Sequence, residues 1–494
     1  GAGNNDLYKA GGNLNSFKDD RRVTIIGMSN NINQQNFGQE DLVGLGGSGG
    51  RGGFRRGGNS SFITGEQDGI TQTNSFGINF TDKLNKKLTV EGSYFLNSTD
   101  NNQNESLIRE TFLNKGSQFY EETSKSNSSN DNHRLNLRLD YDLNDNTKLM
   151  LRSNFSLQNQ INRELTTGRS FVDSSIPLSL VNNLYESKSE SFNMNHNLIY
   201  QHKFKKVGRT ITVDINEQTT PTKQNLSFDD FAQDSIFNYS SKTLNQNYGA
   251  VITYTEPIGS SAQFATKYEY KTTKRNSDIN VFGEDDFGEQ RFNSALSNDF
   301  NSNYSYHQPE LSYSIRKLGS QFSVDLAYQE AILKNDYILT EGIESKQSFH
   351  SLLPSIQGRL ELNSKTRLFA RYSTSTSEPT ISQLQNVVNN TSPLFISIGN
   401  PDLDQTYIHS LRLGARYVNS EKNISLSNFS SVQNSVNYIG ENTSVLTSDS
   451  LINGVMLQRG AQLTSLSNVN GYWSAQNNTT FGIAVPKIKN NVNT

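Results

Sequence analysis

The chain of 494 residues contains no cysteine, one tryptophan and four methionines. The absence of cysteine excludes disulfides, cysteine-ligated zinc and thiol catalysis. Hydrophobic residues make up only 33%, and adding the 36 glycines brings the fraction to about 40%, below the 45–50% typical of globular domains. Charged residues, at 19%, are also scarcer than the usual quarter. Uncharged polar side chains, chiefly Asn, Ser, Thr and Gln, supply the difference.

Charge and aromatic content exclude two further classes of protein. A net charge of −3 offers no basic surface for nucleic acid, so we expect no nucleic-acid partner. Aromatic residues form 10% of the chain, whereas disordered proteins combine few aromatics with a high net charge. The sequence is therefore that of a folded protein with a polar, nearly neutral composition.

Long hydrophobic runs are also missing. No run reaches 18 apolar residues, which excludes a transmembrane helix. The first residues show neither an initiator methionine nor a charged-then-apolar leader, so we expect a mature, trimmed or partial chain. The mean hydropathy of −0.66 suits a soluble protein. It equally suits a large β-barrel, whose strands expose only every second side chain to lipid.

Apolar and polar residues alternate along most of the chain, most clearly between Arg134 and Leu143. Every second residue from Leu135 to Leu143 is Leu or Tyr, and the residues between them are Asn, Arg and Asp. The alternation restarts at Leu149, after the polar sequence 144–146. Two runs of about ten residues joined by a tight Asn/Asp turn predict a β-hairpin.

The same unit recurs along the sequence, with about 17 strands in total and an error of one or two. No stretch has the periodicity of a long amphipathic helix. The other short turns are expected at 82–87, 205–208, 257–259, 317–320, 363–365 and 419–422.

Short turns alternate with long polar connections. Soluble domains seldom contain so many long structureless loops, whereas an outer-membrane barrel has short periplasmic turns on one rim and long extracellular loops on the other. We therefore expect an all-β fold, a large antiparallel transmembrane β-barrel of the outer-membrane type, as a single domain over residues 1–494. The long connections are 30–71, 98–132, 159–189, 218–244, 273–302, 334–350, 377–406 and 437–467.

Aromatic residues support the barrel, because six of them lie on the apolar phase shortly before a short turn. That position is typical of the aromatic girdle on the periplasmic side. His196 interrupts the pattern, since it lies on the apolar phase between Met194 and Leu198; a bulge or a protein neighbour would account for it. The six aromatic residues are Phe80, Tyr141, Tyr200, Tyr254, Tyr313 and Tyr417.

Candidate metal sites are weak. Asp140, Asp142 and Asn144 begin like a calcium loop, but position six is Asn146 instead of Gly and position twelve is not Glu. The acidic stretches at 229–234 and 284–289 are either solvated loop charges or sites for a cation or cationic ligand. The histidines lack metal-ligand spacing, and they are His133, His196, His202, His307, His350 and His409.

The glycine-rich segment Gly44–Gly58 matches neither the phosphate-binding loop nor the dinucleotide fingerprint, because no strand-then-helix context surrounds it. Its arginines, Arg51, Arg55 and Arg56, could touch anionic partners from a flexible tether. We find no nucleophile–base pair, so we assign no catalytic, cofactor-binding or metal-binding residue. We expect neither a cofactor nor an enzymatic activity.

Three stretches resemble the β-barrel portion of TonB-dependent outer-membrane receptors, in the outer membrane protein β-barrel family of Bacteroidetes type. They are Arg21–Leu42; 371–403, with its Gly399-Asn400-Pro401 step; and Asn468–Trp473, which leads into Thr480–Pro486. They stand in the family's order, so the resemblance covers essentially the whole chain.

The resemblance implies a barrel of 22 strands with a plugged lumen, driven by TonB and often paired with a surface lipoprotein. The barrel would be incomplete at both ends here, with the plug and the TonB-interacting segment outside this chain. The expected function is uptake of a nutrient or chelate across the outer membrane. Two alternatives remain: a structural or docking barrel within a larger outer-membrane complex, and a secreted β-rich adhesin.

Overall fold

The computed structural model describes residues 7–33, 69–113, 116–172, 177–232, 235–284, 288–338, 343–386, 388–389, 395–485 and 490–493. Strands dominate these ranges. The single helix within them is α1 (Ile381–Leu384). No helix in this part of the chain is long and apolar enough to cross a membrane.

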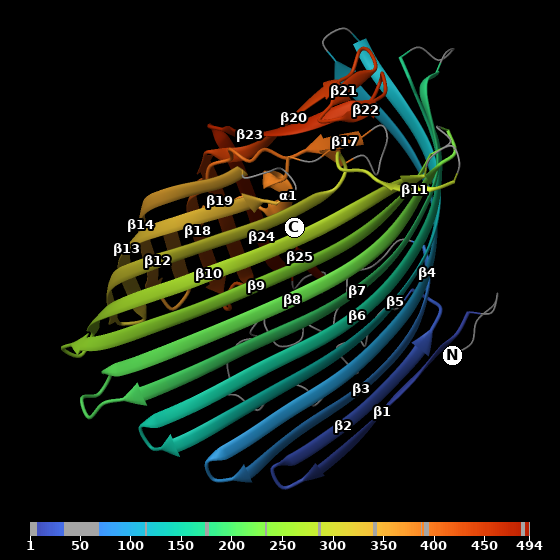
Figure 1. Cartoon of the computed structure of the whole chain (residues 1–494). Coiled ribbons are helices and arrows are strands. Elements are labelled where there is room, and N and C mark those ends of the chain that lie inside the picture. The colour runs from blue at the N-terminus through green and yellow to red at the C-terminus, as the bar shows by residue number, and fades with distance from the viewer. Residues whose placement is uncertain are drawn as a thin grey trace.

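One curved antiparallel sheet forms a barrel wall (Figure 1). The short turns lie along one edge, the short-turn rim, and the longer hairpins end at the opposite edge, the long-hairpin rim. The sheet contains β1 (Lys9–Lys18), β2 (Arg21–Asn30), β3 (Ile70–Asn85), β4 (Leu88–Leu113), β5 (Gly116–Asn144), β6 (Thr147–Phe171), β7 (Pro177–Lys203), β8 (Thr210–Asp230), β9 (Ser235–Ile258), β10 (Ala262–Glu284), β11 (Gln290–Phe292), β12 (Asn298–Lys317), β13 (Ser320–Tyr337), β14 (Ile343–Asn363), β15 (Thr366–Ser377), β18 (Thr406–Asn419), β19 (Ile424–Val436), β24 (Tyr472–Val485) and β25 (Asn490–Asn493).

The strand count agrees with the expectation of about 17. The main sheet has 19 strands. The three-residue β11 pairs with β10 beyond the point where β12 stops pairing with it, so the two share one position in the wall. Among the described residues β1 pairs only with β2, and β24 only with β19 and β25. Six further strands form two small sheets at the long-hairpin rim: β16 (Val388–Asn389), β17 (Phe395–Ile398), β20 (Tyr438–Val445) and β23 (Gln462–Val469) in one, and β21 (Ser450–Ile452) and β22 (Val455–Leu457) in the other.

Asparagine side chains close several of the predicted hairpin turns. Asn85 Oδ1 accepts a hydrogen bond from the backbone N–H of Lys87 at 2.8 Å. Asn144, Asn363 and Asn419 accept the backbone N–H two residues onward in the same way. An Asx turn of this kind lets the chain reverse while keeping its polar groups bonded. These turns therefore form where the sequence predicts them.

The long connections differ from the expectation, because most of them are strand and not structureless loop. The β4–β5 ladder continues without a shift from Leu88↔Tyr141 to Leu113↔Gly116, through all the described residues of segment 98–132. A polar strand is stable there because every backbone group finds a partner in the neighbouring strand. Segments 377–406 and 437–467 instead contribute the small sheets, and residues 34–68 of the first connection lie outside the described ranges.

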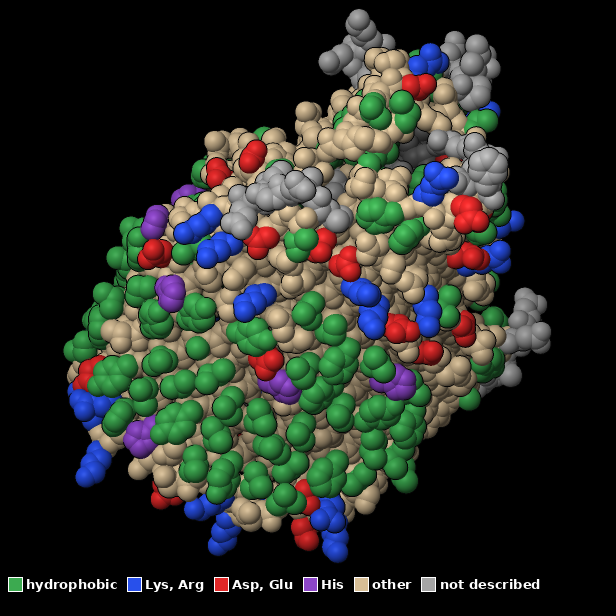
Figure 2. Space-filling view, viewed as in Figure 1, with side chains coloured by type: hydrophobic (Ala, Val, Ile, Leu, Met, Phe, Trp, Pro, Cys, Tyr) green, Lys and Arg blue, Asp and Glu red, His purple; other side chains and the backbone are tan. Residues whose placement is uncertain are grey.

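The alternating apolar and polar residues of the strands lie on opposite faces of the wall. Large hydrophobic side chains cover the outer face (Figure 2), including Leu135, Leu137 and Tyr141, which are 36–47% exposed. On the concave face Arg138 pairs with Asp140 at 2.7 Å and with Glu91 at 3.8 Å. The six predicted girdle aromatics continue the apolar phase near the short-turn rim. An apolar exterior around a polar, ion-paired interior is typical of an outer-membrane barrel.

Substitutions at neighbouring positions test this assignment. Leu137→Arg is expected to lower the free energy of unfolding by about 2–4 kcal/mol, because it places a cation against hydrocarbon. Arg138→Leu is expected to cost less than about 1 kcal/mol, because its ion pairs are solvent-accessible. Urea unfolding from lipid vesicles measures both, and equal costs would contradict the assignment of faces.

Candidate functional site

The long-hairpin rim carries a folded cover, made of β17 and β20–β23, that reaches the far ends of strands early in the sequence (Figure 1). Gln118 on β5 donates from Nε2 to the carbonyl of Gly460 at 2.8 Å. Gln462 on β23 donates to Thr111 Oγ1 at 3.1 Å. One hydrophobic cluster fastens the cover to the wall: Tyr120, Val181, Val281, Leu296, Val388, Ile396, Val455, Leu457 and Ala461. Segments more than 300 residues apart thus meet over one part of the opening.

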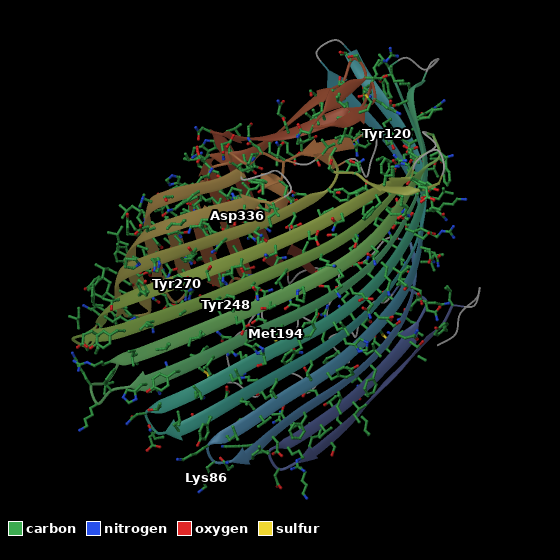
Figure 3. The ribbon with its side chains drawn as sticks, in the orientation of Figure 1. Lys86, Tyr120, Met194, Tyr248, Tyr270 and Asp336 are labelled. Atoms are coloured by element: carbon green, nitrogen blue, oxygen red, sulfur yellow. The ribbon has the colours of Figure 1, made fainter. Side chains whose placement is uncertain are left out.

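The wall beside the cover has an acidic concave surface formed by Glu105, Glu122 and Glu164. The Tyr120 hydroxyl donates to Glu122, and Tyr120 lies near the upper rim (Figure 3). Burial raises the pKa of Tyr120, and its bond to Glu122 adds to the effect. Burial also raises the pKa of Glu164, followed by repulsion from Glu122 and Glu105. The three carboxylates repel anionic solutes and attract cations, while the nearby Arg109 guanidinium offsets part of their charge.

A second part of the site is the inner segment, α1 together with residues 399–405, which packs inside the wall against β12 and β13. Leu384 of α1 and Leu403 are fully buried against Phe300, Leu333 and Tyr337. The segment therefore narrows the interior of the barrel near the cover.

Gly399 is required for this packing. A Cβ atom there would lie 2.3 Å from the carbonyl oxygen of Gln385 and 2.7 Å from that of Gln383. The backbone N–H of Gly399 donates to the Gln385 carbonyl at 3.1 Å, and that of Asn400 to the Gln383 carbonyl at 2.7 Å. A side chain would break these contacts, because backbone oxygens cannot move aside cheaply.

Each of two stretches that carry the family resemblance bonds a residue that adjoins the other stretch. Asn400 donates from Nδ2 to the carbonyl of Leu466 at 3.0 Å. Asn468 donates to the carbonyl of Asp404 at 3.1 Å and accepts the backbone N–H of Asp404 at 2.7 Å. These residues anchor the inner segment to the cover, so their role is structural.

Paired polar groups line the concave wall around this segment. Lys267 bonds Glu269 at 3.0 Å and Glu310 at 3.3 Å, and Arg275 bonds Glu378 at 3.2 Å. Buried Tyr304 accepts a hydrogen bond from Gln405 at 2.8 Å. Such a surface can exchange hydrogen bonds with a polar solute, but the paired charges do not resemble an activated nucleophile or base.

The predicted metal candidates separate in the structure. Asp140 bonds Arg138 and Asp142 lies 3.8 Å from Lys148, while Asn144 closes its turn. Within the described ranges no group of three or more His, Asp or Glu side chains could hold a metal ion. Asp234, residues 285–287 and the segment Gly44–Gly58 lie outside those ranges.

The histidines share a feature that their spacing in the sequence conceals. Each accepts or donates a hydrogen bond at Nδ1 with a hydroxyl group of a neighbouring strand, and in four cases the hydroxyl belongs to a tyrosine. Only the register of the sheet brings these partners together, so the sequence pattern alone could not reveal them.

His196 does not lie at a bulge, because the β6–β7 register runs unbroken through it. Its Nδ1 atom lies 2.9 Å from Ser153 Oγ, and its ring packs edge-on against Phe155 at 5.3 Å. Glu217 is its direct partner on β8. Ser153, His196 and Glu217, the outer polar row, thus interrupt the apolar face that also carries Met194 and Tyr248 (Figure 3).

The sequence matches the model of the outer membrane protein beta-barrel family over residues 202–494, more than half of its length. The chain belongs to this family. Its barrel is therefore an outer-membrane barrel, as the sequence predicts. Comparison with curated proteins yields no match.

Solved outer-membrane receptors are structurally similar to the chain. The ferric yersiniabactin uptake receptor FyuA from Yersinia pestis aligns with a TM-score of 0.51 and 12% identity, over 97% of this chain and 64% of that one. The ferric citrate transporter FecA aligns with a TM-score of 0.49 and 11% identity, over 85% of this chain and 55% of that one. The RagAB peptide importer aligns with a TM-score of 0.47 and 12% identity, over 84% of this chain and 49% of that one. This outer-membrane barrel thus spans about half to two thirds of the length of these proteins.

The barrel's inner segment yields a test at Gly399. Gly399→Ala is expected to destabilise the cover and the inner segment strongly, because the new Cβ collides with two backbone oxygens. Gly27→Ala is the matched control, since a Cβ there meets nothing within 4 Å. Limited proteolysis should cut within 437–467 faster in Gly399→Ala only; equal rates would contradict the packing role.

The outer polar row yields a second test. Glu217→Leu is expected to raise the free energy of unfolding in lipid vesicles by about 1 kcal/mol, because it removes an ionisable group from the hydrocarbon. Ile215→Leu, two residues away on the same face, serves as the neutral control. A loss of stability in Glu217→Leu would contradict this expectation, because it would show that another group of this chain stabilises the Glu217 side chain.

Proposed function

We propose that this chain is the barrel part of a TonB-dependent outer-membrane receptor that takes up a nutrient or chelate through a plugged lumen. The observation that carries the proposal is the folded cover over a concave wall of paired polar groups. A cover at one end of a polar passage suits the capture and release of a solute. The plug and the TonB-interacting segment would belong to a part of the protein beyond this single barrel domain.

The same proposal places the short-turn rim in the periplasm and the long hairpins outside the cell. Its partners would be outer-membrane lipids around the wall, TonB on the periplasmic side, and a surface lipoprotein or another outer-membrane subunit at the cover. The protein would perform no chemistry of its own. The separated histidines and the paired charges of the wall support that view.

A second function is favoured by the outer polar row. Ionisable groups that face hydrocarbon are costly, and contact with another protein would remove His196 and Glu217 from the lipid. The row therefore supports a structural or docking barrel within a larger outer-membrane complex, without transport of its own.

The cover gives the test between these functions. Deleting residues 449–458, which contain β21 and β22, from the full-length gene is expected to abolish growth on the transported solute while the barrel still assembles. A panel of ferric chelates and oligopeptides as sole iron or nitrogen source identifies the solute in the parent strain. If a strain lacking the gene grows like its parent on every source, transport is contradicted and the docking function is retained.

Orientation can be tested directly, because the chain has no cysteine. Thr447→Cys, near the cover, is expected to react with a membrane-impermeant maleimide on intact cells. Lys86→Cys, at the turn between β3 and β4 (Figure 3), is expected to react only after permeabilisation. The reverse pattern would invert the proposed topology.

A further inference from the structure

Four tyrosine–histidine pairs repeat one geometry on the outer face of the barrel. The hydroxyl oxygen and the histidine Nδ1 atom lie 2.6–2.9 Å apart in every pair. The ring centroids are 6.1–6.3 Å apart. The pairs are Tyr94–His133, Tyr268–His307, Tyr328–His350 and Tyr372–His409, hereafter the Tyr–His belt.

The pairs are diagonal in the sheet. The direct partner of His133 is Leu96, two residues beyond Tyr94. The other three histidines likewise lie opposite the residue two positions after their tyrosine. A diagonal of this length is within reach of an aromatic side chain, so each tyrosine approaches its histidine from the side of the short-turn rim.

The hydrogen bond favours one position for the imidazole proton. Among the described residues none of the four tyrosine hydroxyls has another hydrogen-bond partner, so donation to Nδ1 is the arrangement that gives each hydroxyl proton an acceptor. A neutral imidazole that accepts at Nδ1 carries its proton on Nε2. No described residue accepts from Nε2. Each pair therefore presents a free, oriented N–H donor at the outer face.

The belt lies at one level of the barrel wall. The four histidines precede the ends of their strands, Asn144, Lys317, Asn363 and Asn419, by ten to thirteen positions. At about 3.3 Å per residue and a tilt of about 40°, this is roughly 25–33 Å above the short-turn rim. The apolar band of such barrels is about 25 Å tall.

We propose that the Tyr–His belt binds the phosphate groups of membrane lipids at the headgroup level. Phosphate oxygens are strong acceptors, and the Nε2–H groups are donors without a protein partner at the depth where headgroups lie. The belt lies toward the long-hairpin rim, so the orientation proposed above would place these lipids in the outer leaflet. Phosphate binding itself does not depend on it.

Nearby carboxylates make the four pairs differ in their expected affinity for phosphate. Glu330 is the direct partner of both His307 and His350, so its carboxylate competes with phosphate there. Asp131 lies two residues from His133 on the same face. The direct partners of His409 are the neutral residues Thr374 and Asn434, and Tyr407 packs against its ring at 5.0 Å. Phosphate should therefore bind most strongly at His409.

Lipid retention by the purified full-length protein tests the proposal. Native mass spectrometry from detergent would compare phosphatidylglycerol with monogalactosyl diacylglycerol of the same acyl chains, which has no phosphate. Wild type is expected to retain about tenfold more phosphatidylglycerol. Replacing the four belt histidines by Phe should reduce that preference to about twofold, and His409→Phe alone should remove the largest single share.

The chain offers matched controls. His202→Phe changes a histidine that bonds Thr147 next to the short-turn rim, and it should leave the preference unchanged. Tyr→Phe at the four belt tyrosines keeps every ring but releases the imidazoles, so it should give an intermediate preference. Heat-modifiability on gels confirms folding of each variant, and the Tyr→Phe set remains informative if the His→Phe set does not fold.

Three results would overturn the proposal. The first is an unchanged preference in the folded His→Phe set, and the second is an equal loss in His202→Phe. The third is displacement of phosphatidylglycerol by millimolar inorganic phosphate, which would identify a site for the free anion. None of these results depends on solute uptake or maleimide labelling, so this proposal and the transport function can fail separately.

Discussion

The backbone hydrogen-bonding requirement of the membrane determines this structure. Hydrocarbon offers no partner for an N–H or C=O group, so a spanning chain must satisfy every such group internally. Here the wall does so by long ladders; the β4–β5 pairing, for example, extends without a shift from Leu88↔Tyr141 to Leu113↔Gly116. The ladders continue well beyond the apolar band. That continuation provides the tall rim on which the cover rests.

The alternation of side chains then gives each face of the wall its own chemistry. The outward-facing residues contact lipid and are mainly apolar, with aromatic residues near the short-turn rim. The inward-facing residues line a polar interior with ion pairs such as Arg275–Glu378. Polar side chains on the lipid-facing side are informative, because hydrocarbon makes them energetically costly. The outer polar row and the Tyr–His belt are two places where the exterior offers hydrogen bonds, one within the apolar band and one at its margin.

The cover combines residues that no local pattern connects. Gly399 permits a tight reversal against the Gln385 carbonyl, and Asn400 and Asn468 then hold the inner segment to β23 and to the start of β18. The family resemblance in these stretches thus reflects packing at the rim.

The sequence by itself determined the strands, their hairpins and their two faces, because a period of two residues and an Asn-closed turn are local properties. It also excluded helices across the membrane and thiol chemistry. Only the tertiary structure decided that segment 98–132 is ladder and not loop, that 377–406 folds inside the wall, and that Tyr94 reaches His133. The physical reason is register: which side chains meet across strands depends on pairings between distant segments, and alternation along one strand carries no record of them.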